Sequence, residues 1–250
     1  MRSRRIIRGC DGAVEIDETG GSVTKVYLHP DPETAIRNAR REVAYTTRFR
    51  EVLHGVEGVA CPRIIGQDLS APPRVVMDLC PGENLSAYLQ RIDRADPGVA
   101  QIAGRIRLGL ELYTRVFGEP YYDFCFNNML FDPHSGTLTL LDFVVPAGSE
   151  DTGPATPLEA SLGWLIGCAC YELLRPVYLF SSRSAHLVLM RSVVAGFEGR
   201  IDAARVNTRA RAALTVMGSG GGRLRRSYYK TIGLLISGSY LYRLRRARAF

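Results

Sequence analysis

Short runs of alternating apolar and polar residues, separated by turn residues, fill most of the first eighty positions. This alternation is typical of half-buried strands, and the turn Glu18-Thr-Gly-Gly21 predicts a hairpin. Strands are predicted at 5–8, 13–17, 22–28, 63–67 and 74–79. The segment from Glu33 to Leu53 instead has apolar residues at helical spacing, and the glycines at 55–58 end it. The first eighty residues therefore predict about five strands and one long helix.

The pattern changes after the turn Cys80-Pro-Gly82. Apolar residues recur at helical spacing in 85–91 and 98–117, and the chain is again mainly helical from Leu158 onward. The aromatic and cysteine residues of Trp164–Tyr171 are interpreted as the buried core of one of these helices. The sequence thus predicts an α+β chain in three parts: a β-rich N-terminal lobe at 1–80, a helical C-terminal lobe at 81–222 and a basic C-terminal segment at 223–250.

Composition limits the class of protein. A chain of 250 residues with 46% apolar and 23% charged residues can bury a sizeable core, as one domain or as two lobes. Its six cysteines are scattered and form no CxxC pair, which favours reduced, buried thiols in a cytoplasmic protein. No stretch approaches the roughly 20 apolar residues of a membrane span. The basic N-terminus is not followed by a long apolar region, so we expect no signal peptide.

Basic residues are unevenly distributed. Of the 32 basic residues only Lys25 and Lys230 are lysines. We therefore expect that the role of these two positions requires an ammonium group, which arginine cannot supply. The segment 223–250 contains seven arginines, one lysine and no acid, whereas the whole chain has a net charge of +7. Residues 1–222 are therefore close to neutral. The basic tail is suited to an anionic partner, either RNA or a membrane surface. The alternative is a last helix that packs its apolar side on the domain and solvates its arginines.

Three polar residues stand out in the segment 121–145. Asp123 and Asn128 lie five residues apart, and Asp142 follows fourteen residues later at the end of an apolar run. One carboxylate can receive or orient an attacking hydroxyl, while an amide oxygen and a second carboxylate can hold Mg²⁺ against a nucleotide triphosphate. Asp and Asn also favour turns, but their joint spacing favours the chemical interpretation. The segment therefore predicts phosphoryl transfer.

Lys25 lies in the middle of a predicted strand, and Glu42 lies in the helix that follows it. A strand lysine can reach the α- and β-phosphates of ATP, and a Lys–Glu ion pair of this kind is part of protein-kinase sites. The alternative is a lysine exposed on an edge strand and a solvated glutamate. The rarity of lysine and the polar residues downstream favour the ion pair.

The turn Gly9-Cys-Asp-Gly12 lies where a loop covering the phosphates is expected. Backbone N–H groups around Gly9 and Gly12 can bind phosphate oxygens. A plain hairpin turn would have a similar sequence, so both interpretations remain open.

A second turn, at residues 78–82, is expected to face the base of a nucleotide. An apolar strand ends there, so the backbone from Asp78 to Cys80 can meet the edge of adenine while Met77 lines the ring pocket. A buried strand that runs into a simple linker is the alternative.

The order of these residues resembles that of the protein-kinase-like superfamily over about residues 5–175. In particular it is similar to the small atypical members: aminoglycoside and choline phosphotransferases, lipopolysaccharide-core kinases and the minimal kinase of the KEOPS complex. The segment 121–143 is similar to the pattern H-x-D-x-x-x-x-N…D-F-G, and Pro81-Gly-Glu-Asn-Leu85 is similar to P-G-x-x-L. The resemblance implies a bilobal protein-kinase-like fold, with a small antiparallel β-sheet and one helix in the N-lobe and a mainly helical C-lobe.

The resemblance also implies ATP and Mg²⁺ as cofactors and assigns roles to the residues. Asp123 would be the catalytic base, Asn128 and Asp142 the Mg²⁺ ligands, and Lys25 a phosphate-binding residue oriented by Glu42. No A-P-E-like element follows Asp142, which argues against an ordinary protein kinase with a regulated activation loop. A hydroxyl of a small molecule or sugar is therefore favoured over one of a protein, while lipid-linked sugars, RNA-associated complexes and proteins stay open as acceptors.

Three positions depart from the family pattern. Tyr121 stands where His is usual, Tyr122 where Gly or Arg is common, and Val144 replaces the Gly after Asp-Phe. None of these changes removes a catalytic group. They nevertheless keep open a nucleotide-binding pseudokinase or regulatory partner, and the basic tail keeps open a protein that acts by binding RNA or a membrane.

Overall fold

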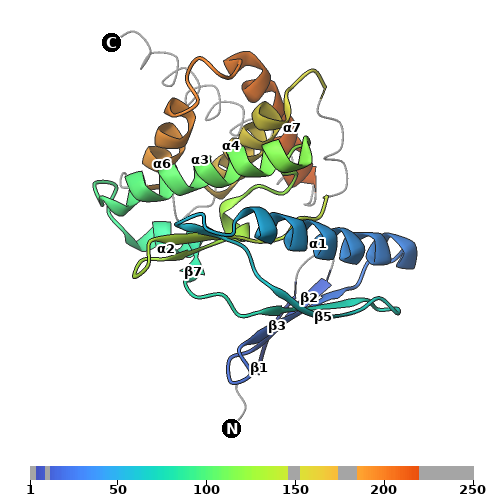
Figure 1. Ribbon diagram of the computed structural model, residues 1–250. Coiled ribbons are helices and arrows are strands. Elements are labelled where there is room, and N and C mark those ends of the chain that lie inside the picture. The colour runs from blue at the N-terminus through green and yellow to red at the C-terminus, as the bar shows by residue number, and fades with distance from the viewer. Residues whose placement is uncertain (1–3, 9–11, 146–152, 174–184, 220–250) are drawn as a thin grey trace.

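The computed structural model describes residues 4–8, 12–145, 153–173 and 185–219 of the chain. Gly9 of the expected phosphate loop and the basic segment 223–250 lie outside these residues. The described residues form two lobes, with the long helix α1 (Pro32–Val52) lying between a β-sheet and the helices of the other lobe (Figure 1).

The N-terminal lobe is built on an antiparallel sheet with the strand order β1-β2-β3-β6-β5. Its strands are β1 (Arg4–Arg8), β2 (Gly12–Asp17), β3 (Ser22–Tyr27), β5 (Ile64–Asp68) and β6 (Arg74–Asp78). Strand β3 is central, and Lys25 pairs there with Val14 of β2 and Val75 of β6. Lys25 is therefore not on an edge strand, and the alternative of an exposed edge lysine is wrong.

Helix α1 begins where the sequence predicts, and for local reasons. The side chain of Asp31 accepts hydrogen bonds from the backbone amides of Glu33 and Thr34, and Pro32 occupies the first turn, where its missing N–H costs nothing. The buried residues of the helix recur at three- and four-residue spacing: Ala35, Ala39, Glu42, Thr46 and Phe49. Glu42 is the one carboxylate in this buried stripe.

The C-terminal lobe is mainly helical. Its helices are α2 (Leu85–Arg91), α3 (Gly98–Phe117), α4 (Pro157–Leu173), α6 (Ala185–Ala195) and α7 (Ala203–Ser219). The predicted segments 85–91 and 98–117 coincide with α2 and α3. Gly118, with a φ of 67°, ends α3 in the left-handed conformation that glycine adopts without strain.

A second, four-stranded sheet lies in this part of the molecule, with the order β4-β9-β8-β7. Its strands are β4 (Val59–Ala60), β7 (Glu83–Asn84), β8 (Met129–Asp132) and β9 (Thr137–Leu140). Strand β9 lies in the apolar run that the sequence places directly before Asp142. A short 3₁₀ turn, η1 (Phe126–Asn128), leads into β8.

The described residues confirm the predicted α+β fold: an antiparallel sheet with one helix in one lobe and a mainly helical second lobe. Strand β6 ends at Asp78, and β7, which belongs to the other sheet, begins at Glu83. The proposed limits of the three parts of the chain stay predictions. Among the residues described, no helix is both long enough and apolar enough to cross a membrane.

Candidate active site

Three charged side chains from three separate elements meet between the lobes. Lys25 Nζ of β3 lies 2.7 Å from Asp142 Oδ1, which follows β9, and 3.5 Å from Glu42 Oε2 of α1. Their side chains are 16%, 26% and 1% exposed, respectively. Burial alone would lower the pKa of Lys25, but the carboxylates of Asp142 and Glu42 outweigh burial and raise it well above its usual value. The ammonium therefore stays charged at neutral pH.

The backbone around Asp142 is held by hydrogen bonds on both sides. Phe143 donates its amide to Glu42 Oε2 at 3.0 Å, and its carbonyl accepts from Arg41 Nε at 3.0 Å. On the other side, Leu141 donates its amide to the carbonyl of Asn128 at 2.9 Å, and its carbonyl accepts from the Tyr121 hydroxyl. Two consecutive residues of α1 and two residues of the segment 121–128 thus fix the residues that flank Asp142.

Asp142 itself has a φ of 63°, the one positive φ among the described non-glycine residues. A left-handed conformation costs a non-glycine residue about 1 kcal/mol or more, and it persists where the surroundings enforce it. The four hydrogen bonds on Leu141 and Phe143 provide that enforcement. The conformation of Asp142 is therefore set by contacts from both lobes.

Asp123 and Asn128 are joined directly. Asn128 Nδ2 donates to Asp123 Oδ2 at 2.7 Å and to the Asp123 carbonyl at 3.0 Å, while Trp164 Nε1 donates to Asp123 Oδ1 at 3.3 Å. Burial, followed by the negative charge of Asp142, raises the pKa of Asp123 to about 6. A carboxylate with a pKa near neutrality is suited to general base catalysis, because it is ionised yet readily accepts a proton.

Tyr121, which departs from the family's usual His, packs inside the core of the site. Its ring stacks on Tyr113 and Phe143 with centroid distances of 4.6 and 5.1 Å. Its amide donates to Ser161 Oγ at 2.9 Å, and its hydroxyl donates to the carbonyl of Leu141. Tyr121 therefore supports both the segment that carries Asp123 and the segment that carries Asp142.

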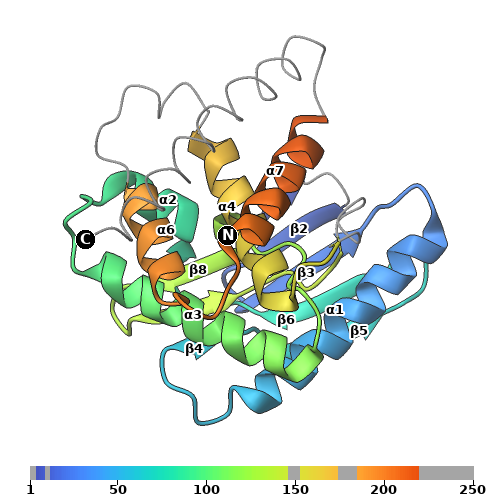
Figure 2. The same cartoon turned by 90° about the horizontal axis from the view of Figure 1, so that it is seen from above.

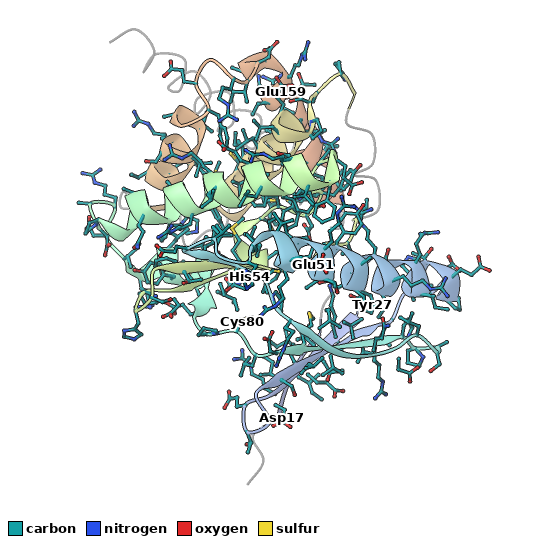
Figure 3. The ribbon with its side chains drawn as sticks, in the orientation of Figure 1. Asp17, Tyr27, Glu51, His54, Cys80 and Glu159 are labelled. Carbon is teal, nitrogen blue, oxygen red and sulfur yellow. The ribbon has the colours of Figure 1, made fainter. Side chains whose placement is uncertain are left out.

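Several polar atoms of the site are well placed to hold a metal ion and phosphate. Lys25 Nζ and Asp142 Oδ1 are buried and contact each other at 2.7 Å, and the hydroxyl of Tyr27, whose ring centroid lies 5.1 Å from Lys25 Nζ, is buried as well. Figure 3 shows Tyr27 between the N-lobe sheet and α1. Asn128 uses Nδ2 for its hydrogen bonds to Asp123, which leaves Oδ1 as an acceptor. An ammonium has three donors and a carboxylate oxygen can accept more than one contact, so these atoms can bind a ligand in addition to each other.

The donor set fits Mg²⁺ in one particular way. Over the described residues, no three His, Cys, Asp or Glu side chains gather as a metal-binding group. A site made of the Asp142 carboxylate and the Asn128 amide oxygen would need nucleotide phosphates and water to complete six oxygen ligands. Mg²⁺ commonly binds in this manner in enzymes that use ATP.

The expected adenine-facing turn uses some of its backbone groups internally. The amide of Asp78 donates to the carbonyl of Arg63 at 3.0 Å, and the amide of Leu79 donates to the carbonyl of Gly21 at 2.9 Å. Met77, 8% exposed, lies in the small apolar cluster of the N-lobe. Burial raises the pKa of the Cys80 thiol to about 12, which favours the protonated thiol over the reactive thiolate.

Gly12 lies in strand β2 rather than in a loop. A Cβ atom at this position would come within 2.2 Å of the carbonyl oxygen of Val26 on β3. The close approach of the two strands therefore requires glycine here, which gives Gly12 a structural role whether or not its neighbourhood binds phosphate.

The geometry adds three residues that sequence reasoning did not assign to the site: Arg41, Tyr27 and Trp164. The sequence pattern predicts Trp164 as a core residue. It is indeed 3% exposed, but its indole N–H also reaches Asp123. Arg41 and Tyr27 each lie one or two positions from a predicted site residue. Their proximity in sequence was the available signal, but their contacts depend on how the lobes pack.

Comparisons with known proteins give little beyond the chain's own geometry. No protein-family model matches the chain, and no curated protein sequence does. Among solved structures, the chain is similar to that of the Cydia pomonella Granulovirus kinase, PK-1, with a TM-score of 0.38 and 13% sequence identity. The match covers 56% of this chain and 51% of the viral kinase, so the chain spans about half the length of that protein. The description of two lobes with charged side chains meeting between them therefore rests on this chain's own elements.

Proposed function

We propose that the protein is a phosphotransferase that moves the γ-phosphate of ATP, in the presence of Mg²⁺, to a hydroxyl of a small molecule or sugar. The proposal rests on one observation above all: Lys25 lies 2.7 Å from Asp142 and 3.5 Å from Glu42. A rare lysine buried between two carboxylates from different elements is an arrangement that phosphate chemistry needs and that fold stability does not.

Lys25 and Glu42 would bind and orient the nucleotide phosphates. The ammonium supplies a fixed positive charge, and Glu42 keeps it in place because its carboxylate is buried and also bonded to Phe143. When phosphate oxygens enter, the Lys25 ammonium can exchange its contact with Asp142 for a contact with them. That exchange would free the Asp142 carboxylate.

Asp142 and Asn128 would hold the metal ion through the carboxylate and the free amide oxygen. Bound Mg²⁺ supplies positive charge that neutralises the charge of the nucleotide phosphates. The left-handed conformation of Asp142 and its flanking hydrogen bonds would keep its carboxylate in one orientation before the ion arrives.

Asp123 would accept the proton of the attacking hydroxyl or orient that hydroxyl. Asn128 and Trp164 hold its two carboxylate oxygens, which restricts the side chain to one orientation. Holding the reacting groups in line and excluding water are the main contributions that a protein makes to phosphoryl transfer. Its raised pKa leaves Asp123 ionised at neutral pH but close to taking up a proton.

Adenine binding would fall to the turn after β6. The amides of Asp78 and Leu79 are already bonded to the carbonyls of Arg63 and Gly21, so the base would meet the Cys80 amide and the Asp78 carbonyl, which in the structure has a weak contact with the Cys80 thiol at 3.9 Å. Met77 would line the ring pocket, and Gly9 and Gly12 would lie near the phosphates.

The test combines binding with turnover. Mg·ATP should raise the melting temperature of the wild-type protein, and ATP consumption should be stimulated by one member of a panel of sugars, amino alcohols and aminoglycosides. Asp123→Asn should abolish transfer while nucleotide binding stays within about twofold of wild type. Asp93→Asn, at an exposed aspartate remote in sequence from the site, is the matched control and should behave as wild type.

Asp142→Asn should have a different effect. Asn tolerates the left-handed backbone at this position, so the fold is kept, but the loss of the charge should weaken Mg·ATP binding by about tenfold or more. Full transfer activity in Asp123→Asn would overturn the assignment of the base.

A nucleotide-binding pseudokinase is the second candidate, and the observation that favours it is Val144 in place of the family's glycine. Val144 packs on the N-lobe cluster that contains Met77. Stabilisation by Mg·ATP without turnover under any acceptor would establish this candidate. A role of the segment 223–250 in binding RNA or a membrane stays a separate prediction: deletion of that segment should remove the binding together with its salt dependence.

A further inference from the structure

The Asp123 carboxylate is held at both oxygen atoms by two N–H donors from different parts of the C-lobe, and the Cys125 thiol adds a weaker contact to Oδ1 at 3.9 Å. Asn128 Nδ2 donates to Oδ2 at 2.7 Å, and Trp164 Nε1 donates to Oδ1 at 3.3 Å. The first contact is local, since Asn128 is five residues away. The second brings in a residue of α4, 41 positions along the chain.

Trp164 is placed by the close packing of α4 on α7. Added Cβ atoms at Gly163 and Gly167 would lie 2.5 Å from Arg209 Cβ and 2.6 Å from Ala213 Cβ, so glycine at both positions lets α7 approach. Figure 2 shows the two helices side by side. The indole then packs in a small buried cluster with Cys125, Cys168 and Ala213, and it is 3% exposed.

Arg209 further restricts the indole ring. Its guanidinium carbon lies 5.8 Å from the centroid of the Trp164 ring, and the residue is 7% exposed. A cation over the face of an indole is attracted by the ring, and the attraction is larger where water is excluded. The ring that donates to Asp123 is therefore held by α7 as well as by its own helix.

Packing alone does not explain the choice of tryptophan. A phenyl ring would also fill an apolar cluster, whereas a buried indole N–H loses its hydration and needs an acceptor. That acceptor is an ionisable carboxylate, and at a given distance an ionised acceptor attracts an N–H donor more strongly than a neutral acceptor does. The carboxylate, in turn, gains a second fixed donor in a buried place.

We propose that Trp164 is a positioning residue for Asp123: its indole N–H fixes the second carboxylate oxygen, so that the remaining lone pairs face the acceptor hydroxyl. This role rests on the proposed phosphotransfer. Without the indole, Oδ1 would keep only the weak thiol contact of Cys125 at 3.9 Å, so the carboxylate could turn about its Cβ–Cγ bond. Misplacement of a reacting group by a fraction of an ångström is costly to the rate. With the N–H donors of Asn128 and Trp164 both in place, the plane of the carboxylate is defined before the acceptor binds.

The kinetic test removes the N–H and keeps the ring. Because Trp164 is the one tryptophan of the chain, it can be replaced throughout by benzothienylalanine, in which sulfur takes the place of the N–H group. We expect kcat to fall about tenfold or more while KM for ATP changes less than about twofold. Trp164→Phe should give the same split with an additional loss of stability. Cys168→Ala, which alters the same cluster without the donor, should keep the kcat of the wild-type protein.

A second measurement does not depend on turnover. The single indole N–H gives one resolved signal in a ¹⁵N–¹H spectrum, and we expect it at high frequency with slow hydrogen exchange. Asp123→Asn removes the charge of the acceptor, so the signal should move to lower frequency and exchange about tenfold faster. Cys168→Ala should leave the exchange rate as in the wild-type protein.

The outcomes separate the two proposals. The positioning role is overturned if Asp123→Asn leaves the frequency and exchange rate of the indole signal unchanged. It is also overturned if kcat is unchanged in the benzothienylalanine protein. A responsive indole signal together with no transfer to any acceptor overturns the phosphotransferase and leaves Trp164 as the residue that holds Asp123.

Discussion

Glu42 accepts a hydrogen bond from the backbone amide of Phe143 at 3.0 Å, although 101 positions separate the two residues. The same oxygen atom, Oε2, lies 3.5 Å from Lys25 Nζ. One buried carboxylate oxygen therefore contacts both the residue that would bind phosphate and the backbone next to Asp142. The position of α1 thus determines the position of Lys25 and of the segment that carries Asp142, and displacement of this helix would disturb both.

Glu42→Gln should separate these two contacts. A glutamine oxygen can still accept from the Phe143 amide, but the charge that pairs with Lys25 is lost. We expect a fold close to wild type in melting temperature and a loss of kcat/KM for ATP of about 10- to 100-fold, which corresponds to about 1.4–3 kcal/mol. Thermal melts and initial rates check this result.

Glu42→Ala is the informative comparison, since it removes both contacts and leaves the Phe143 amide buried without a partner. Its melting temperature should fall as well as its activity, by the equivalent of about 1–3 kcal/mol. Equal melting temperatures for Glu42→Gln and Glu42→Ala would show that the bond to Phe143 does not stabilise the segment.

Arg41 binds the other end of the same peptide unit. Its Nε donates to the Phe143 carbonyl, its guanidinium pairs with Glu119, and its guanidinium carbon lies 4.0 Å from the centroid of the Tyr45 ring. Arg41→Met keeps much of the aliphatic stem but removes all polar contacts. We expect it to lower stability by about 1–3 kcal/mol and to weaken Mg·ATP binding more than ADP binding without metal. Isothermal titration with both nucleotides measures the difference.

Arg40→Met is the matched control for this change. Arg40 precedes Arg41 on α1 but is exposed, so its loss should leave stability within about 0.5 kcal/mol and nucleotide binding as in wild type. If both substitutions lowered stability and nucleotide binding equally, the cause would be the lost positive charge on α1 and not the lost hydrogen bond between Arg41 and Phe143.

Tyr121→Phe tests whether the departure from the family's His matters for chemistry. The substitution keeps the stacking on Tyr113 and Phe143 but removes the hydrogen bond to the Leu141 carbonyl. We expect a loss of stability of about 1–3 kcal/mol, because a buried carbonyl loses its donor. Catalysis should fall only modestly, since the hydroxyl acts on backbone and not on substrate. A loss of kcat as complete as that of Asp123→Asn would instead make the Tyr121 hydroxyl a participant in the reaction.

Long, strongly periodic elements were predictable from the sequence because their signals are local. The segment 98–117 has an apolar helical stripe and ends at Gly118, and α1 has a capping Asp31 followed by Pro32. The two-residue strands β4 and β7 were not predicted. Each is defined by pairing with a distant strand, β9 or β8, and two residues carry no pattern of their own.

In the site, too, the features with a local sequence signal were predictable and those that depend on distant contacts were not. Lys25, Glu42, Asp123, Asn128 and Asp142 were recognisable because their types and spacing suit one kind of chemistry, and the structure brings Lys25 to both Glu42 and Asp142, and Asn128 to Asp123. The contacts of Arg41 with Phe143 and of Trp164 with Asp123 could not be predicted. They depend on how α1 meets the C-lobe and how α4 meets α7, and an arginine on a helix or a tryptophan in a core is compatible with many other contacts.

The pH dependence of transfer should follow the protonation of Asp123. Burial and the charge of Asp142 raise the pKa of Asp123 to about 6. Above that pH the carboxylate is ionised and can take the proton of the acceptor. Below it the carboxylate is already protonated, so kcat/KM for the acceptor should fall about tenfold for each further pH unit. Profiles measured between pH 5 and pH 8, roughly one unit or more on either side of this pKa, would locate the midpoint.

Asp142→Asn provides the internal check of this pH dependence. Its remaining activity should show an acidic limb displaced to lower pH, because one of the two influences that raise the pKa of Asp123 has been removed while burial remains. The opposite displacement, or a limb that stays in place, would mean that the group titrating near pH 6 is not Asp123. The direction of the shift therefore identifies the base through its neighbour, without altering the base itself.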